Sequence, residues 1–449
     1  MLNHLLIISS IIITFIIIGF RNPQKYLFFW GVFTIPFSYD YTLYSVQFPG
    51  FTGWVHGIIV RLSDIFFLLL YILLSFTKIN VENSFIKKYN FKFPIALLII
   101  AFLLSSISAI WRIFSFYEII NIIKISFFYF YIPIKFIKNK SDLKFAINIL
   151  VVTLFFQAVV GIVQFLYQDY YMFLRTGKGV FLTYFHGLVR SHGTVGQPNG
   201  YAGYLLPIIL LTLSIVVAMK NKYITLYIIV LVVGMLALVL SFSRAGWIGF
   251  IIGSCIVFYM GKRKDSYKTI SLANKFFVLV FIFTFLTVFS YKIFYERWTL
   301  SDSGAAEDRW YLMQIAFNII KKNLFFGVGV NNYRFAMYQY VPENYDWPYI
   351  YIVHNLYLLV FAETGIIGFI AILLLFYIPC KLLIKNLKTI NSEYLPYAIG
   401  LLAGFIGSAI QNIVDITWAS SICNSLYFLQ LSFTNILLNI ENNQKSSNI

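Results

Sequence analysis

The chain has 449 residues, of which 60% are hydrophobic, 20% aromatic and only 11% charged. Soluble domains carry roughly 25% charged residues, so this composition excludes an ordinary water-soluble fold. The net charge of +17 does not indicate a nucleic-acid partner, because the basic residues are scattered among connections between apolar segments and do not gather on one soluble face.

Apolar segments follow one another along the chain and repeatedly approach the roughly 20 residues needed to cross a hydrocarbon core. Because no water solvates the backbone in lipid, we expect these segments to be helices. The first, Leu5 to Phe20, is not followed by a small-residue cleavage site, which indicates a retained helix; a removed signal peptide is the alternative. The second is short and suits either a span or a re-entrant segment, so twelve or thirteen transmembrane helices are predicted. The segments lie near residues 4–20, 25–38, 60–77, 93–110, 118–136, 145–167, 199–218, 223–241, 245–260, 276–291, 355–379, 395–414 and 419–438.

The connections between these segments alternate in lysine content. Lysine-rich connections, such as those around Lys87, Lys138 and Lys264, are expected in the cytoplasm together with the C-terminal tail. The orientation of the N-terminus stays open, since neither Lys nor Arg precedes Arg21. The longer connections are then expected to face outward, and they span residues 39–59, 168–198 and 292–354.

The outer connection 292–354 is too short for an independent domain but long enough for one or two helices. From Asp308 to Lys322 its apolar positions suit an amphipathic helix lying on the membrane surface, and they are Trp310, Met313, Phe317 and Ile320. The fold class predicted for residues 1–449 is therefore a single, all-α polytopic membrane domain with a large outer loop that contains short helices.

Arginine is distributed differently from lysine. Two of the ten arginines, Arg21 and Arg263, fall on the lysine-rich side. A guanidinium group matches phosphate oxygens bidentately, so the outer arginines predict a phosphate-binding layer. The alternative is pairing with outer-loop acids such as Asp302, Glu307 and Asp308. The arginines at or beyond the outer boundary are Arg61, Arg112, Arg175, Arg190, Arg244, Arg297, Arg309 and Arg334.

The segment from Ser241 to Trp247 connects two apolar segments so tightly that Arg244 is expected at the outer lip of a helical hairpin. A charge there is costly without a partner. Ala245 and Gly246 permit close approach of the two helices. The alternative for Arg244 is an interfacial anchor that reaches to water.

The segment from His354 to Gly368 opens the helix that follows the large outer loop. His354 is expected at its outer mouth, where an imidazole can accept a proton near neutral pH. Glu363 lies about 13 Å deeper on a straight helix and on another face. It is either functional or a structural link to another helix, and Gly365 and Gly368 are expected to allow close packing.

Two glycine-containing segments complete the set. Residues 190–204 end an outer connection, and Pro198 with Asn199 predicts a helix start. Residues 327–334 close the large outer loop. In both segments the glycines are expected to let the backbone come close to a ligand, although each pattern alone is weak.

Taken together, the four segments resemble the O-antigen ligase and O-antigen polymerase superfamily of membrane glycosyltransferases. The resemblance covers roughly residues 190–370, and the helix count extends it to the whole chain. The matching residues are Gly193 to Leu205, Ser243 to Gly246, Arg309 followed by Gly327 to Tyr333, and His354 to Gly368.

The resemblance implies a GT-C-like fold and transfer of a glycan from an undecaprenyl-diphosphate carrier to a sugar hydroxyl, with inversion, during surface polysaccharide assembly. It implies a multi-pass protein of the bacterial inner membrane with its active site on the periplasmic face, surrounded by membrane lipids. His354 would be the catalytic base, and neither a metal nor another cofactor is expected. Arg61 has pairing with Asp64 as its alternative. The expected diphosphate contacts are Arg190, Arg244, Arg309 and Arg61, supported by Glu363, Asn355 and Asn199.

The acceptor stays open. A polymerase joins one lipid-linked glycan to another, whereas a ligase attaches the glycan to lipid A-core; the long aromatic outer loops favour a polymerase slightly. A chain-length regulator is a further possible partner. A polysaccharide-lipid transporter is the alternative from another class, but it should show inverted repeats and charges near the midplane, whereas the charged candidates here cluster on one face.

Overall fold

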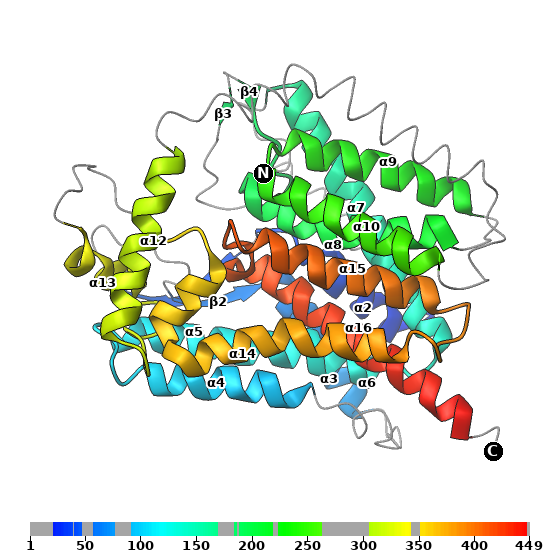
Figure 1. Cartoon of the computed structure of the whole chain (residues 1–449). Coiled ribbons are helices and arrows are strands. Elements are labelled where there is room, and N and C mark those ends of the chain that lie inside the picture. Colours follow the sequence, from blue (N-terminus) through cyan, green and yellow to red (C-terminus); the bar gives the residue numbers. More distant parts are fainter. Residues whose placement is uncertain are drawn as a thin grey trace.

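The computed structural model describes residues 21–38, 40–46, 57–76, 91–168, 184–185, 188–218, 223–262, 305–342 and 351–446. These residues are mostly helical (Figure 1). Every predicted apolar segment within them coincides with a helix, while the segments at 4–20 and 276–291 lie outside the described residues. Five described helices are long and apolar enough to cross a membrane. The predicted all-α polytopic membrane fold is thus confirmed.

The long membrane helices include one composite span, in which α5 (Arg112–Ile125) continues through the π-helical turn η3 (Ser126–Tyr131) into α6 (Ile132–Phe136). The other long helices are α7 (Lys140–Leu166), α8 (Pro198–Ala218), α10 (Arg244–Lys262) and α14 (Leu356–Asn386). The remaining helices of the bundle are α2 (Pro23–Phe33), α3 (Leu62–Phe76), α4 (Lys92–Ser105), α9 (Ile224–Leu240), α15 (Leu395–Gln411) and α16 (Ser421–Ser446).

Helix α8 forms the centre of the bundle. Its apolar window is 94% buried, so protein and not lipid surrounds it. It packs against α15, α10, α9 and α7. Glycines let α10 and α15 meet backbone to backbone, since a Cβ added to Gly249 would lie 2.7 Å from the carbonyl oxygen of Gly407. Such small-residue contacts are the usual way in which membrane helices approach closely, because lipid supplies little hydrophobic driving force between them.

The bundle has two distinct ends (Figure 1). One end carries α12 (Ala305–Lys322), α13 (Tyr333–Ala336) and the strand pair β1 (Asp40–Ser45) and β2 (Gly57–Arg61); we call it the outer end. The opposite end carries the C-terminal part of α16 and the turn between α14 and α15. Lys385 and Lys388 lie beside that turn, so the lysine-rich connection there and the C-terminus share an end, as the alternation of the loops predicts.

Helix α12 runs across the ends of the long helices (Figure 1). The predicted helix is confirmed. Part of its predicted apolar stripe is exposed, which is compatible with a helix lying on a membrane surface, whereas Ile320 of that stripe is buried. Leu312, Ile315 and Ile319 are buried, whereas Trp310 is 57% and Phe317 46% exposed. The helix is apolar on two sides, and α14 covers one of them.

Two short antiparallel strand pairs depart from the purely helical expectation. In the first, β1 pairs with β2 from Asp40 opposite Arg61 to Ser45 opposite Gly57. The second joins Tyr184–Phe185 to Leu188–Val189. Both pairs fall in connections predicted to face outward, where water can satisfy the backbone groups of open strand edges.

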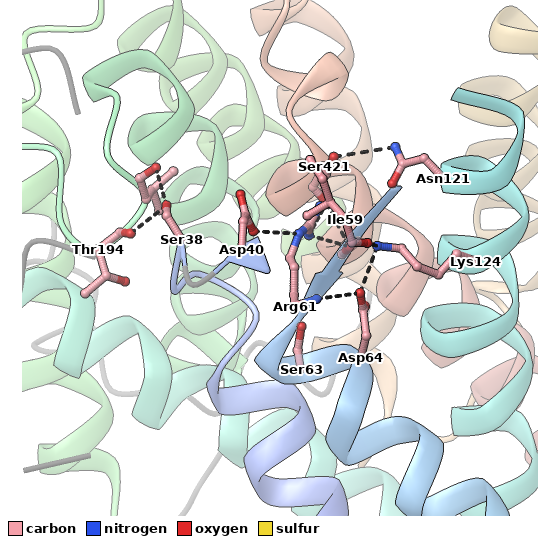
Figure 2. A network of polar contacts seen from close by, with 12 residues as sticks. Ser38, Asp40, Ile59, Arg61, Ser63, Asp64, Asn121, Lys124, Thr194 and Ser421 are labelled. Carbon is pink, nitrogen blue, oxygen red and sulfur yellow. Dashed lines mark hydrogen bonds and ion pairs between the residues drawn. The ribbon is translucent and has the colours of Figure 1, made fainter. Parts of the chain in front are cut away.

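A buried ionic network ties β2, α3, α5 and α16 together (Figure 2). Asp64 is 2% exposed and accepts hydrogen bonds from Lys124 Nζ at 2.8 Å, from the Tyr129 hydroxyl at 2.6 Å and from the backbone N–H of Arg61 at 3.0 Å. These three donors satisfy the hydrogen-bonding capacity that a buried carboxyl group would otherwise lose on leaving water.

Arg61 is 3% exposed, and its guanidinium group pairs with Asp40 at 3.5 Å. The same group donates to the Ser421 carbonyl at 2.9 Å and to Ser425 Oγ at 3.2 Å, both at the start of α16. Arg61 therefore meets Asp64 through its backbone only, and its side chain links β2 to α16.

We expect Asp64→Ala to lower the free energy of unfolding by about 3–5 kcal/mol, because it leaves the buried charge of Lys124 unpaired. Asp142→Ala is the matched control: Asp142 pairs with Lys25 at 3.6 Å, and Lys25 is 36% exposed, so the loss should be about 0–1 kcal/mol. Thermal and denaturant unfolding in detergent would measure both. Equal destabilisation by the two variants would contradict the role given to Asp64.

Candidate active site

His354 stands at the outer mouth of α14, as the sequence predicts. The helix begins at Leu356 because Asn355 caps it. The Asn355 side chain accepts a hydrogen bond from Leu358 N at 3.0 Å. The N–H of Leu356 donates to the carbonyls of Asn412 at 3.0 Å and Asp415 at 3.2 Å. These bonds fix the connection between α15 and α16 beside the histidine.

The imidazole of His354 is held in one tautomer. Nδ1 lies 3.1 Å from the carbonyl oxygen of Ile352, and since a carbonyl only accepts, Nδ1 carries the hydrogen and Nε2 keeps its lone pair. Burial lowers the pKa of His354, the charge of Arg309 lowers it further, and the charge of Asp415 opposes them. The ring is therefore neutral near pH 7, and its Nε2 can accept a proton.

Asp415 belongs to this site, although the motifs did not identify it. It is 5% exposed and accepts a hydrogen bond from Ile416 N at 2.8 Å. Burial raises the pKa of Asp415, while the Ile416 amide and then the charges of His354, Arg309 and Arg190 oppose that rise. A single acid in the polar break between the last two apolar segments was the available signal in the sequence.

Arg190 joins two of the four motif segments. Its Nε donates to the carbonyl of Ser241 at 2.9 Å, and a terminal guanidinium nitrogen donates to Asn199 Oδ1 at 2.8 Å. Arg244 begins α10 just after that turn. Gln411, at the end of α15, reaches the carbonyl of Asn199 at 3.5 Å. The predicted helix start at Pro198 is confirmed.

Arg309 completes the group from α12. It is half-buried, and its charge acts on both His354 and Asp415. The structure thus brings together most of the predicted site residues, namely His354, Arg190, Arg309, Asn199 and Asn355, with Arg244 at the neighbouring turn. Arg61 is engaged elsewhere, and its diphosphate contact stays a prediction that its burial does not support.

Glu363 binds the glycine-containing segment that closes the large outer loop. Its carboxylate accepts a hydrogen bond from Tyr333 N at 3.1 Å and further bonds from the backbone amides of Asn331 and Asn332. Its carbonyl accepts from Gly329 N at 2.9 Å. Glu363 is thus a structural link, as one of the two expectations held, but its partner is the backbone of an outer loop and not a side chain of another helix.

A break in α14 makes room for this docking. Gly365 lies inside the helix with φ of 66° and ψ of −165°, a conformation that residues with a Cβ avoid. A Cβ there would lie 2.1 Å from the carbonyl oxygen of Phe325. The close packing expected at Gly365 is therefore confirmed. It joins α14 to the segment that directly follows α12.

Gly327 and Gly193, one from each of the two weak motifs, lie close to neighbouring protein groups, and the approach of these motifs to a ligand stays a prediction. A Cβ on Gly327 would lie 2.3 Å from the backbone carbonyl of Glu363. A Cβ on Gly193 would lie 2.5 Å from the ring of Tyr201 and 2.7 Å from Gln157. Sequence alone shows that such positions need a small residue, but not which neighbour comes close.

We expect Gly327→Ala to destabilise the protein by at least about 1–3 kcal/mol, since φ is +68° there and the added methyl group would meet backbone. Gly200→Ala is the matched control in α8, where the nearest atom to an added Cβ lies 3.5 Å away; it should be neutral or slightly stabilising. Melting temperatures in detergent would decide, and a tolerated Gly327→Ala would refute the docking described here.

Part of the chain is similar to a known protein family. Residues 227–373 match the model of a family described as O-antigen ligase. No curated protein matches the chain. The matched range contains Arg244, Arg309, His354 and Glu363, whereas Arg190 and Asp415 reach the same site from outside it. The chain is therefore a multi-pass membrane protein in which residues 227–373 are similar to the O-antigen ligase family.

Proposed function

We propose that this protein transfers a glycan from an undecaprenyl-diphosphate carrier to a sugar hydroxyl at the outer face of the bacterial inner membrane, in surface polysaccharide assembly. The observation that carries the proposal is the fixed tautomer of His354: the Ile352 carbonyl holds Nδ1–H, so that Nε2 is left as the base. Arg309 and Asp415 act on this ring from two other segments.

In the proposed reaction the acceptor hydroxyl gives its proton to His354 Nε2 while its oxygen attacks the anomeric carbon. The bond from that carbon to the phosphate oxygen breaks on the opposite side, so the configuration inverts and the lipid diphosphate leaves with the bonding electrons. Asp415 stabilises the imidazolium that forms, in the way that a buried acid supports a catalytic histidine in other enzymes.

The leaving diphosphate carries several negative charges, and arginine suits it because its planar fork binds two phosphate oxygens at once. Arg190 and Arg309 are half-buried and lie near one buried acid, Asp415. Positive groups fixed in a poorly solvated site stabilise developing negative charge strongly, since they need not reorganise during the reaction. Arg244, at the start of α10, is proposed as the third contact.

The acceptor separates the two forms of the proposal. Purified protein incubated with lipid-linked repeat units alone should lengthen the glycan if it is a polymerase, which is the form we favour. Dependence of transfer on added lipid A-core would instead identify a ligase. Movement of the lipid-linked glycan across vesicles without any new glycosidic bond would identify a transporter and refute both.

We expect His354→Gln to reduce transfer by about 10²–10⁴-fold, the usual contribution of a general base. The variant should retain the melting temperature of the wild-type protein. Glu393→Gln, an exposed acid near the start of α15, is the control and should transfer normally. Unchanged transfer by well-folded His354→Gln would refute the assignment.

The charges around His354 predict opposite pH shifts. Asp415 raises the pKa of His354, so Asp415→Asn should move the acidic limb of the transfer rate to lower pH. Arg309 lowers that pKa, so Arg309→Gln should move the limb to higher pH. In both variants the rate rises as the imidazole loses its proton. Rate profiles at saturating donor would measure the shifts, and shifts in one direction only would contradict this arrangement.

A further inference from the structure

A cavity of about 50 Å³ lies inside the bundle, next to the candidate active site and deeper along α14. By the same measure one water molecule needs about 10–15 Å³, so the space suits roughly three or four waters. Its walls include Leu356 and Trp418, close in sequence to His354 and Asp415, and several apolar side chains. Its polar wall consists of Glu118, Asn331, Glu363, Thr364, Trp418 and Asn424.

Two side chains of this wall have polar atoms without hydrogen-bond partners among the residues that the structure describes. Asn424 is 3% exposed, and its Oδ1 acceptor is unpaired. Trp418 is 5% exposed, and its Nε1–H donor is unpaired. A buried unpaired group costs about 1–3 kcal/mol. A water molecule can donate a hydrogen bond to Asn424 Oδ1 and accept one from Trp418 Nε1–H. A bare cation could bind Oδ1 but could not accept a hydrogen bond from Nε1–H.

Two glutamates face this cavity and interact electrostatically. Glu363 accepts three backbone amide bonds from the segment before α13, which favour its charged form. Glu118 has the side chain of Asn121, on its own helix, as a hydrogen-bonding partner. Two like charges in one largely apolar cavity are unfavourable, and Glu118 is the member with less support for a charge.

The positive groups that act on Glu118 are already paired. Lys124 binds Asp64 at 2.8 Å, and Arg61 pairs with Asp40 at 3.5 Å. Because each of these cations already pairs with an aspartate, neither is available to neutralise Glu118. The remaining way to limit the charge in the cavity is a proton on Glu118.

We propose that this cavity is a hydrated proton site, in which Glu118 carries a proton and water links it to Glu363 and Asn424. The site stands independently of the glycan-transfer proposal. It connects to the candidate active site through Glu363, which holds the segment that follows α12, the helix of Arg309. Ionisation of Glu118 would place a second negative charge beside Glu363 and weaken that attachment.

Infrared spectroscopy of the full chain in detergent tests the proposal directly, since a protonated carboxylic acid has a carbonyl band separate from those of carboxylates. One such band should be present near neutral pH, shift in D₂O and disappear in Glu118→Gln. Asp142→Asn is the control and should keep the band. A band that persists in Glu118→Gln, or is absent from the wild-type protein, would overturn the proposal.

Stability gives a second measurement. If Glu118 holds its proton to higher pH in the folded protein than in the unfolded chain, the folded protein loses stability as pH rises through the range in which Glu118 ionises. The melting temperature of the wild-type protein should therefore fall from mildly acidic to mildly alkaline pH, and less so in Glu118→Gln. Stabilisation by added Na⁺, K⁺, Ca²⁺ or Mg²⁺ that Glu118→Gln abolishes would make this a cation site and overturn the proposal.

A third variant keeps the test decisive if Glu118→Gln does not fold. Asn424→Leu leaves Glu118 in place and removes the unpaired acceptor from the cavity wall. Because it alters the hydrogen bonding around the acid, the carbonyl band should shift in frequency without being lost. An unshifted band in folded Asn424→Leu would contradict the water-mediated link.

Discussion

The site depends most on the bond between Glu363 and the backbone amides of residues 331–333. This carboxylate lies about two turns inside a membrane helix, where an unsatisfied charge would be costly. The amides of an outer loop supply its hydrogen bonds, so the loop and the helix each satisfy polar groups of the other. His354 directly precedes α14, and Glu363 lies within it. The same helix therefore positions both the imidazole and residues 331–333 of the outer loop.

Two buried acids in this protein illustrate different uses of charge. Asp64 has Lys124, Tyr129 and a backbone amide as donors, which is the pattern of a structural link. Asp415 is surrounded by the His354 ring and two arginines, and the positive charges of these groups oppose the effect of burial on its pKa. Around Asp415, positive groups and burial act in opposite directions, so the site can take a change of charge on His354 during a reaction. In the Asp64 network, a change of charge on Asp64 or Lys124 would break their ion pair.

Much of the fold could be predicted from sequence because hydropathy and segment length decide which stretches can lie in lipid. The position of His354 followed from its place directly before a helix, with Asn355 as a suitable cap. Contacts between distant segments could not be predicted: Asp415 meets His354 only because the connection after α15 folds back on Leu356. The side of α12 that packs on α14 could not be predicted either, since both sides of that helix are apolar and the sequence does not show which side α14 covers.

Helix α12 has one face against α14 and another, with Trp310 and Phe317, that no described part of the protein covers. Aromatic side chains of this kind favour the boundary between lipid headgroups and acyl chains. With this face in that boundary, the depth of Arg309 relative to the membrane would be set by α14 on one side and by the lipid interface on the other. In that arrangement the bilayer would be part of the scaffold, and its thickness and headgroup composition would act on the proposed reaction as pH or salt do.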